Sequence, residues 1–267
     1  TPKELKEQFP LFNTCDNHFD FFNLHEEHQC NNMNNENMIL YEPEAGYFDP
    51  TSSMNDLVQA CQRDNIDIRF SSQVTNILRN KTHVQGIQYT NIKKKEEIEI
   101  ISPKVINCSG PWVNEILNYA NINSGSLSFH PTRIQVCYKK VSSEIMDQIP
   151  VVCDIQGGVY FRPQLASNQL LLGSIREEDE QEIVDPNDYN QSCDPESKMR
   201  FLSGLHHRIE QIPQRGEVIG MSGLYTICAE DFHPAIGEAK SQLQGFYFCN
   251  GFSGHGFKIA PSVGSLM

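Results

Sequence analysis

The sequence has little positive charge and no long apolar run, and each shortage excludes a class of protein. It carries 34 Asp and Glu residues against 21 Lys and Arg, which gives a formal net charge of -13. Such an acidic chain has no electrostatic support for binding nucleic acid. No stretch approaches the roughly 18 consecutive apolar residues that a membrane-spanning helix needs, and no signal peptide is visible. We therefore expect no nucleic-acid partner and no membrane span in this segment.

Paired cysteines are also missing. The nine cysteines are an odd number, and none forms a Cys-x-x-Cys pair. Cys108, Cys137 and Cys249 lie within apolar runs that are typical of strands, where a reduced thiol behaves as a small hydrophobic side chain. This usage favours a reducing, intracellular compartment, either the cytoplasm or a mitochondrion.

The first 45 residues contain few signals of regular structure. Thr1, Pro2 and Glu4 predict an N-cap, a first-turn proline and a capping box for a short helix that ends near Phe9. The Asn-rich stretch that follows shows no helical or strand period, so we interpret it as an irregular insertion. Its residues His25, His28 and Cys30 have side chains that bind zinc. No second ligand pair follows at finger-like spacing, so we expect no metal site.

Residues 46–123 alternate between helix and strand patterns. A helix capped by Ser52 or Ser53 is predicted to lead into a strand at 66–70. Three further strands, 74–78, 84–89 and 97–101, predict an antiparallel meander, with the basic run 93–95 at a hairpin tip. A buried strand at 105–110 then ends in a glycine turn before a helix with an apolar face formed by Trp112, Val113, Ile116, Leu117 and Ala120.

Residues 124–238 have the character of a mainly antiparallel domain. Strands are predicted at 128–140, 157–163, 170–174 and 217–228, and a helix capped by Asp194 is predicted over 195–212. Residues 239–267 return to a strand at 245–250, a glycine turn and a helix that begins near Phe257. The order predicts four segments, 1–45, 46–123, 124–238 and 239–267, with the second and fourth closing one discontinuous domain.

The segment 250–258 carries the clearest chemical signal. It places Gly251, Gly254 and Gly256 between a predicted strand and a predicted helix. Glycines there allow a ligand to approach the backbone, and the free amides of a helix N-terminus favour electron-rich oxygen. One hypothesis is a serine nucleophile elbow at Ser253, but His255 stands where that motif needs a glycine. The other hypothesis is a cradle for the pyrimidine end of a flavin.

Six blocks of sequence support the flavin hypothesis. They are residues 46–50, Val74, residues 107–112, residues 158–163 with 172–173, residues 223–237 and residues 251–258. With these blocks in this order, the chain resembles the D-amino-acid oxidase and sarcosine oxidase (glycine oxidase-like) superfamily of FAD-dependent oxidoreductases. The resemblance implies an α/β (α+β) fold, in which a discontinuous Rossmann-like FAD-binding domain is joined to a mainly antiparallel substrate domain.

The resemblance also implies how FAD is bound. Val74 would contact the adenine through its backbone, and Gly223 replaces the cysteine through which sarcosine oxidases attach flavin, so non-covalent FAD is expected. The diphosphate and ribose side would face Cys108, Ser109, Gly110 and Trp112. The closing motif at the flavin would consist of Gly251, Ser253, Gly254, His255, Gly256, Phe257 and Lys258. Packing of the helix is the alternative role for Trp112.

Four side chains are candidates for catalysis. Lys258 would supply a cation for a substrate carboxylate and His255 a polar group beside the amine. A surface lysine and a loop-packing histidine are the alternatives. Tyr160 and Arg162 share one face of an alternating strand and would line the substrate cavity. For Arg162 the alternative is a structural ion pair.

The implied activity is FAD-dependent oxidation of the C–N bond of an amino acid or N-methylated amine by hydride transfer. Oxygen or an electron carrier would then reoxidise the flavin. A non-catalytic flavin-binding assembly factor or subunit and a serine hydrolase remain as alternatives. The G-x-G-x-x-G turn and the acidic ribose ligand of such enzymes are absent, and the first residue is Thr1. We therefore predict that the chain is the C-terminal part of a longer enzyme.

Overall fold

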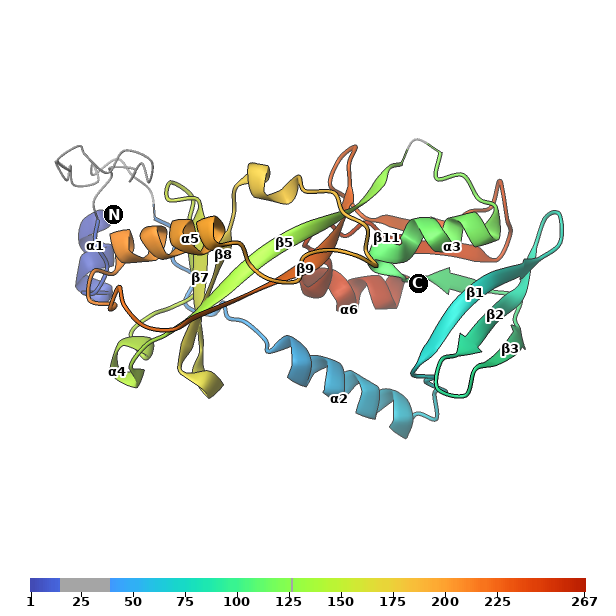
Figure 1. The fold of residues 1–267 in the computed structure, drawn as a ribbon, viewed down its shortest axis with the longest axis horizontal. Helices are drawn as coiled ribbons and strands as arrows, with labels where there is room; N and C mark the ends of the chain where they lie inside the picture. The colour runs from blue at the N-terminus through green and yellow to red at the C-terminus, as the bar shows by residue number, and fades with distance from the viewer. Residues whose placement is uncertain (15–38, 126) are drawn as a thin grey trace. The chain divides into compact units, whose positions relative to one another are not determined.

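The computed structural model describes residues 1–14, 39–125 and 127–267, which form two compact units (Figure 1). Unit 1 contains Thr1–Tyr47, Ile134–Glu182 and Asn190–Gly223, and unit 2 contains Phe48–Arg133, Ile183–Tyr189 and Leu224–Met267. Two of the points at which the chain changes unit fall within long strands, β5 (Phe129–Lys140) and β9 (Val218–Cys228). The predicted insertion with His25, His28 and Cys30 lies outside the described residues. Which unit serves the cofactor and which the substrate stays a prediction.

A five-stranded sheet has the order β6-β7-β8-β5-β9. Its shorter strands are β6 (Val152–Asp154), β7 (Val159–Gln164) and β8 (Gln169–Ser174), and the pairs β6–β7, β7–β8 and β8–β5 are antiparallel. Helix α5 (Pro195–Arg208) lies against β7 and β8, as Figure 1 shows. Its residues Phe201 and Leu205 are buried in one core with Phe161 and Leu172 of the sheet. The antiparallel character predicted for this region is confirmed.

The remaining elements of unit 1 are short. Helix α1 (Pro2–Gln8) begins with the predicted capping box of Thr1 and Glu4. Helix α4 (Ser143–Met146), strand β6 and the 3-10 turns η2 (Leu165–Ser167) and η3 (Glu177–Glu180) were not predicted. They are too short for a periodic pattern to reveal them.

Helix α5 begins at Pro195 as predicted, but its C-terminal end and the role of its cap residue differ from the prediction. The chain leaves the helix at Ile209, whose φ of -136° is not helical, so the predicted end at Ile212 is wrong. Both isoleucines are buried in the unit 1 core, which accounts for the apolar pattern beyond the helix. Asp194 occupies the N-cap position, but its side chain does not cap the helix. Its carboxylate accepts hydrogen bonds from Gln135 and Asn190 instead.

In unit 2, the predicted meander is confirmed as β1 (Ser72–Arg79), β2 (Val84–Asn91) and β3 (Glu96–Ile101), paired in that order and antiparallel. The run 93–95 lies in the turn between β2 and β3. Helix α2 (Pro50–Arg63) is capped by Asp49, which accepts a hydrogen bond from the Ser52 amide at 2.8 Å. The predicted cap at Ser52 or Ser53 is therefore wrong by one helical turn.

The predicted strand at 66–70 is also wrong. These residues are irregular, and within the described part of the chain no strand pairs with them. A strand needs a neighbour for its backbone hydrogen bonds, whatever its side-chain alternation. Here Arg69 bonds instead to Asp67 and to the hydroxyl of Tyr89.

The second sheet of unit 2 has the order β10-β11-β4. Strand β11 (Phe246–Asn250) pairs with β10 (Ala235–Glu238) antiparallel and with β4 (Val105–Asn107) parallel. The predicted strand at 105–110 thus ends at Asn107, before η1 (Gly110–Trp112) and helix α3 (Val113–Ala120). Helix α6 (Gly256–Leu266) follows β11. None of the helices in residues 1–14, 39–125 and 127–267 has both the length and the apolar character of a bilayer span.

Candidate functional site

Two glycine turns meet at one edge of the β10-β11-β4 sheet. Strands β4 and β11 are parallel neighbours, and each leads through a glycine turn into a helix. The carboxyl ends of parallel neighbours lie at the same edge, so the turns at Gly110 and Gly251 are adjacent. Open α/β sheets bind their ligands at this position.

Asn250 connects the two turns. Its side chain is fully buried, and its Nδ2 donates a hydrogen bond of 2.6 Å to the backbone carbonyl of Asn107. Its Oδ1 accepts a hydrogen bond of 3.0 Å from the backbone amide of Gly110. The side chain of Asn107 holds Ser109 in turn, through its Oδ1, while its buried Nδ2 has no partner among the described residues. The Nδ2 group of Asn107 is thus a buried donor beside the turns that is available to bond an acceptor atom of a ligand.

The turn after β11 needs glycine for steric reasons. Gly251 has a φ of +75°, and a Cβ there would lie 2.8 Å from the Phe129 ring. Gly254 has a φ of +81°, and a Cβ there would lie 2.7 Å from the Tyr225 ring. Both positions therefore combine a left-handed backbone with close packing. These contacts account for glycine at both positions, and the approach of a ligand to this backbone stays a prediction.

The N-terminus of α6 is open. The backbone amides of Gly254, Gly256 and Phe257 donate no hydrogen bond to any described residue. The side chains of His255 and Lys258 are exposed, and neither has a hydrogen bond or ion pair in the described part of the chain. Free amides, the positive end of the helix dipole and a cation together suit an electron-rich or anionic ligand.

Ser253 has a structural role in this turn. Its side chain is buried, its Oγ accepts a hydrogen bond from the Cys228 amide at 3.0 Å, and it donates one to the Gly251 carbonyl at 3.2 Å. A nucleophilic serine needs an exposed hydroxyl bonded to a general base. This geometry argues against the serine hydrolase alternative.

The turn after β4 presents different groups. Gly110 has a φ of +56°, and the side chain of Thr226 is the nearest group to its open side. Trp112 is partly exposed, and its indole N–H donates to Asn187 Oδ1 at 2.8 Å. Asn187 in turn donates a hydrogen bond to Glu115 of α3. One residue, Asn187, therefore holds the side chains of both Trp112 in η1 and Glu115 in α3.

Two further predicted cofactor residues lie away from these turns in the sequence. Val74 is in β1, where it is paired with Tyr89 beside a β-bulge and packs on the unit 2 core. Gly223 is exposed in β9 and belongs to unit 1. No heavy atom lies within 4 Å of a Cβ built at Gly223, so a side chain would fit there.

Tyr160 and Arg162 lie in β7 of unit 1, on the face opposite to its buried residues. The predicted shared face is confirmed. The Tyr160 ring covers Gly173, and the Arg162 guanidinium lies 4.5 Å from the Tyr47 ring centroid. Arg162 also bonds to Gln164 Oε1 at 2.6 Å. The structural ion pair considered for Arg162 is not formed with any described residue.

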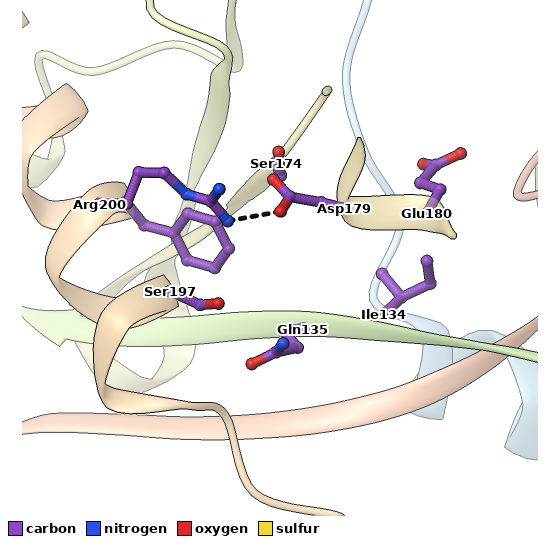
Figure 2. Close-up of a pocket in the computed structure, with 8 residues that line it drawn as sticks. Ile134, Gln135, Ser174, Asp179, Glu180, Ser197 and Arg200 are labelled. Carbon is purple, nitrogen blue, oxygen red and sulfur yellow. Dashed lines mark hydrogen bonds and ion pairs between the residues drawn. The ribbon is translucent and has the colours of Figure 1, made fainter. Parts of the chain in front are cut away.

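A small pocket in unit 1 was not predicted from the sequence (Figure 2). Arg200 of α5 pairs with Asp179 at 2.5 Å, and the other Asp179 oxygen is buried without a partner among the described residues. The enclosed space of ≈ 10 Å³ fits about one water molecule. Gln135, Ser174 and Ser197 line it. The pocket is too small for an organic substrate. Its ion pair joins Arg200 of α5 to Asp179, so we assign the pocket a structural role in holding α5.

The sequence analysis missed the role of the two asparagines. Asn107 and Asn250 each end a parallel strand just before a glycine turn, and this matching position was the available signal. Their mutual contact depends on strand pairing between distant parts of the chain, which no local pattern reveals. The roles of Asn187 and Thr226 left no signal in the sequence.

The fold and this edge of parallel strands agree with the comparison to known families. A family model described as "FAD dependent oxidoreductase" matches residues 26–267. The chain therefore belongs to the FAD-dependent oxidoreductase (DAO) family, and the resemblance inferred from the sequence blocks is confirmed.

Two curated proteins are similar to the chain over nearly its whole length. It is 24% identical to mitochondrial sarcosine dehydrogenase of Mus musculus, over 99% of this chain and 26% of the relative. It is 23% identical to "FAD-dependent oxidoreductase domain-containing protein 1" of Bos taurus, over 99% of this chain and 54% of the relative. The chain thus spans about a quarter to a half of these curated relatives.

A solved structure supports the fold. L-proline dehydrogenase from P. horikoshii matches 99% of this chain and 61% of its own, with a TM-score of 0.72 and 20% identity. The predicted α/β class with antiparallel sheets is confirmed, and the fold is that of flavoenzymes of this family.

The described residues fit an FAD molecule. The unpartnered Asn107 Nδ2, the open amides of α6 and the steric need for Gly251 and Gly254 form a cradle for oxygen atoms or an electron-rich ring edge. The sequence contains no G-x-G-x-x-G fingerprint. These residues therefore account for part of a dinucleotide site.

Proposed function

We propose that this chain forms part of an FAD-dependent oxidoreductase that oxidises the C–N bond of an amino acid or N-methylated amine. The observation that carries the proposal is the pair of glycine turns joined by Asn250 at the carboxyl ends of β4 and β11. Membership of the FAD-dependent oxidoreductase family agrees with cofactor binding at this edge of the β10-β11-β4 sheet.

The two turns take different parts of the cofactor in this proposal. Ser109 and Gly110, with Cys108 and Trp112 beside them, would face the diphosphate and ribose, and Val74 would contact the adenine. The amides of Gly254, Gly256 and Phe257 would face the pyrimidine end of the flavin, where the positive end of α6 stabilises negative charge. Non-covalent binding is proposed, because Gly223 offers no sulfur for attachment.

A bound flavin would supply the redox chemistry, namely acceptance of a hydride (two electrons and one proton) from the carbon beside the substrate nitrogen. The exposed ammonium of Lys258 would bind the substrate carboxylate, and His255 would lie beside the amine. Tyr160 and Arg162 would line the substrate cavity from the face of β7 that is not part of the core. These residues bind and orient the substrate and need no unusual acid–base strength.

The names of two similar proteins support a proposal for the substrate class. Their names specify sarcosine and L-proline, which are amino acids with a secondary amine. We propose the same class here, with oxygen or an electron carrier as the acceptor and the cytoplasm or a mitochondrion as the compartment. The mouse relative is named as mitochondrial.

Absorption spectroscopy of the purified full-length protein tests cofactor binding first. Oxidised flavin bands that are released on denaturation are expected, and their absence after reconstitution with FAD would refute the proposal. Anaerobic addition of N-methyl amino acids, proline and D-amino acids should then bleach the bands. A protein that keeps its flavin but is not bleached by any substrate of a broad panel would be a non-catalytic flavin-binding assembly factor or subunit.

A fluorophosphonate probe separates the oxidoreductase from the hydrolase alternative. Because the Ser253 hydroxyl is buried and bonded to backbone groups, no labelling is expected. Labelling that disappears in Ser253→Ala, with the fold retained, would contradict this interpretation.

A further inference from the structure

Two thiols lie side by side where β4 and β11 reach the glycine turns. The parallel register pairs Phe248 with Asn107, and the next residues along the two chains are Cys249 and Cys108. Residues directly opposite each other on paired strands point to the same face of the sheet. The electrostatic influence of Cys249 on Cys108 agrees with this placement of the two thiols.

The backbone spacing is suitable for a covalent link. Paired strands lie about 4.8 Å apart, and disulfides join Cα atoms that are about 4.4–6.8 Å apart. Both cysteines are free thiols, Cys108 exposed and Cys249 partly exposed. A small oxidant can therefore reach the pair from the Cys108 side.

We propose that Cys108 and Cys249 form a redox modification site, in which hydrogen peroxide converts the two thiols into a cross-strand disulfide. One thiolate attacks peroxide and becomes a sulfenic acid, and the first water leaves. The second thiol attacks that sulfur, the S–S bond forms, and the second water leaves. The two sulfurs lose two electrons and two protons in total, and the peroxide takes up both.

The surroundings of Cys108 determine how the reaction depends on pH. Although Cys108 is accessible, it is partly desolvated, and this desolvation together with the neighbouring Cys249 raises the pKa of Cys108 to about 11. Its thiolate is scarce at neutral pH, and thiolates are the reactive species. Disulfide formation is therefore slow at pH 7 and becomes faster as the pH rises toward 9.

Other cysteines provide internal comparisons. Cys137 and Cys193 are close enough to interact, but both are buried in the unit 1 core and inaccessible to an oxidant. Cys153 is exposed in β6, where it is paired with Tyr160. Cys153 is therefore the control: like Cys108 it is exposed, but the residue opposite it on the paired strand carries no thiol.

Oxidation of the full-length protein followed by peptide mapping tests the site. The protein is treated with hydrogen peroxide at pH 7 and pH 8.5, free thiols are alkylated, and the digest is examined by mass spectrometry. The expected product is a peptide containing Cys108 linked to one containing Cys249, more abundant at pH 8.5 and absent after dithiothreitol. Cys108→Ser and Cys249→Ser should each abolish it, whereas Cys153→Ser should leave it unchanged.

The digest of the wild-type protein is sufficient to refute the proposal. The test therefore remains valid even if one of the Cys→Ser variants fails to fold. Recovery of Cys108 and Cys249 as alkylated thiols or separate sulfinic acids, under conditions that oxidise Cys153, would refute the link. A disulfide that joins either residue to another cysteine would refute it as well. Because Cys108 is also proposed to face FAD, the oxidation is carried out with and without bound flavin. The digest of the flavin-free protein decides the link, so its failure and the failure of the proposed function can be told apart.

Discussion

Asn250 and Asn107 lie 143 positions apart in the sequence, yet the side chain of one bonds to the backbone of the other at 2.6 Å. The same Asn250 side chain also accepts a hydrogen bond from Gly110, so it fixes the turn that follows β4. One fully buried amide thus positions both turns of the candidate cofactor site relative to each other.

Removing this amide should destabilise the protein. Asn250→Ala leaves the Asn107 carbonyl and the Gly110 amide without their partner, and each unsatisfied buried group costs about 1–3 kcal/mol. A lower midpoint in urea unfolding is expected. Asn55→Ala, on the exposed surface of α2, is the control and should change the midpoint little. Equal midpoints for the two variants would show that the bridge does not contribute to stability.

Glycine is required at Gly251 and not at Gly264. Gly251→Ala forces a side chain into a left-handed backbone against Phe129, at a cost of about 1–2 kcal/mol from the backbone alone. Gly264 lies in α6 with no atom near its Cβ position, so Gly264→Ala should stabilise the helix by roughly 0.5–1 kcal/mol. Thermal unfolding of both variants would check the opposite signs. A destabilised Gly264→Ala would contradict the open surroundings described here.

The ion pair between Asp154 and Arg208 should contribute strongly to stability. Both side chains are at least nine-tenths buried, and Arg208 Nε lies 2.6 Å from Asp154 Oδ2. Asp154→Asn breaks this buried ion pair, and breaking a buried pair by removing one charge costs about 3–5 kcal/mol. The exposed pair of Asp67 and Arg69 is the control, and Asp67→Asn should cost about 0–1 kcal/mol. Denaturant titrations of the two variants at pH 7 provide the comparison.

The same pair predicts a dependence on pH. Burial alone would raise the pKa of Asp154, but the hydrogen bonds and charge of Arg208 and the Gly157 amide outweigh it, and the pKa is lowered. A carboxyl group with a lowered folded pKa stabilises the protein fully above its unfolded pKa of about 3.9. The contribution is lost as the pH falls through the folded value. The stability difference between wild type and Asp154→Asn should therefore be constant from pH 7 to about 5 and shrink below pH 4.

Lys258 is predicted to distinguish substrates by charge. In the flavin-loaded full-length protein, Lys258→Met removes the cation proposed for the carboxylate and should raise KM for amino acids by roughly 10- to 100-fold. Amide analogues without the negative charge should be affected much less. Lys240→Met changes an exposed lysine before β11 and serves as the control. Equal effects of Lys258→Met on acids and amides would remove the proposed role.

The sequence predicted most strands and the closing glycine turn because their signals are local. Alternation placed β7, and the capping box of Thr1 and Glu4 placed α1. Errors arose where distant parts of the chain decide the outcome. The run 66–70 alternates as a strand but has no strand partner in the described segments, and the apolar pattern of α5 continues through buried residues that are not helical.

The candidate site was predicted to a smaller extent. The glycines after β11 were identified because glycine itself is the signal. The bridge from Asn250 to Asn107 was not, since it follows from the parallel pairing of β4 and β11. The structural role of Ser253 likewise depends on the backbone of β9, where its hydroxyl bonds Cys228.

The parallel pairing of β4 with β11 also constrains the order of folding during synthesis. All segments of unit 1 have been synthesised once Gly223 is reached, whereas β11, the partner of β4 among the described residues, is complete only after residues 246–250 have been translated. Contacts so distant in sequence are slow to form, and an unpaired strand edge is prone to aggregate meanwhile. Nascent chains released before β11 would therefore depend on chaperones more than chains that include it.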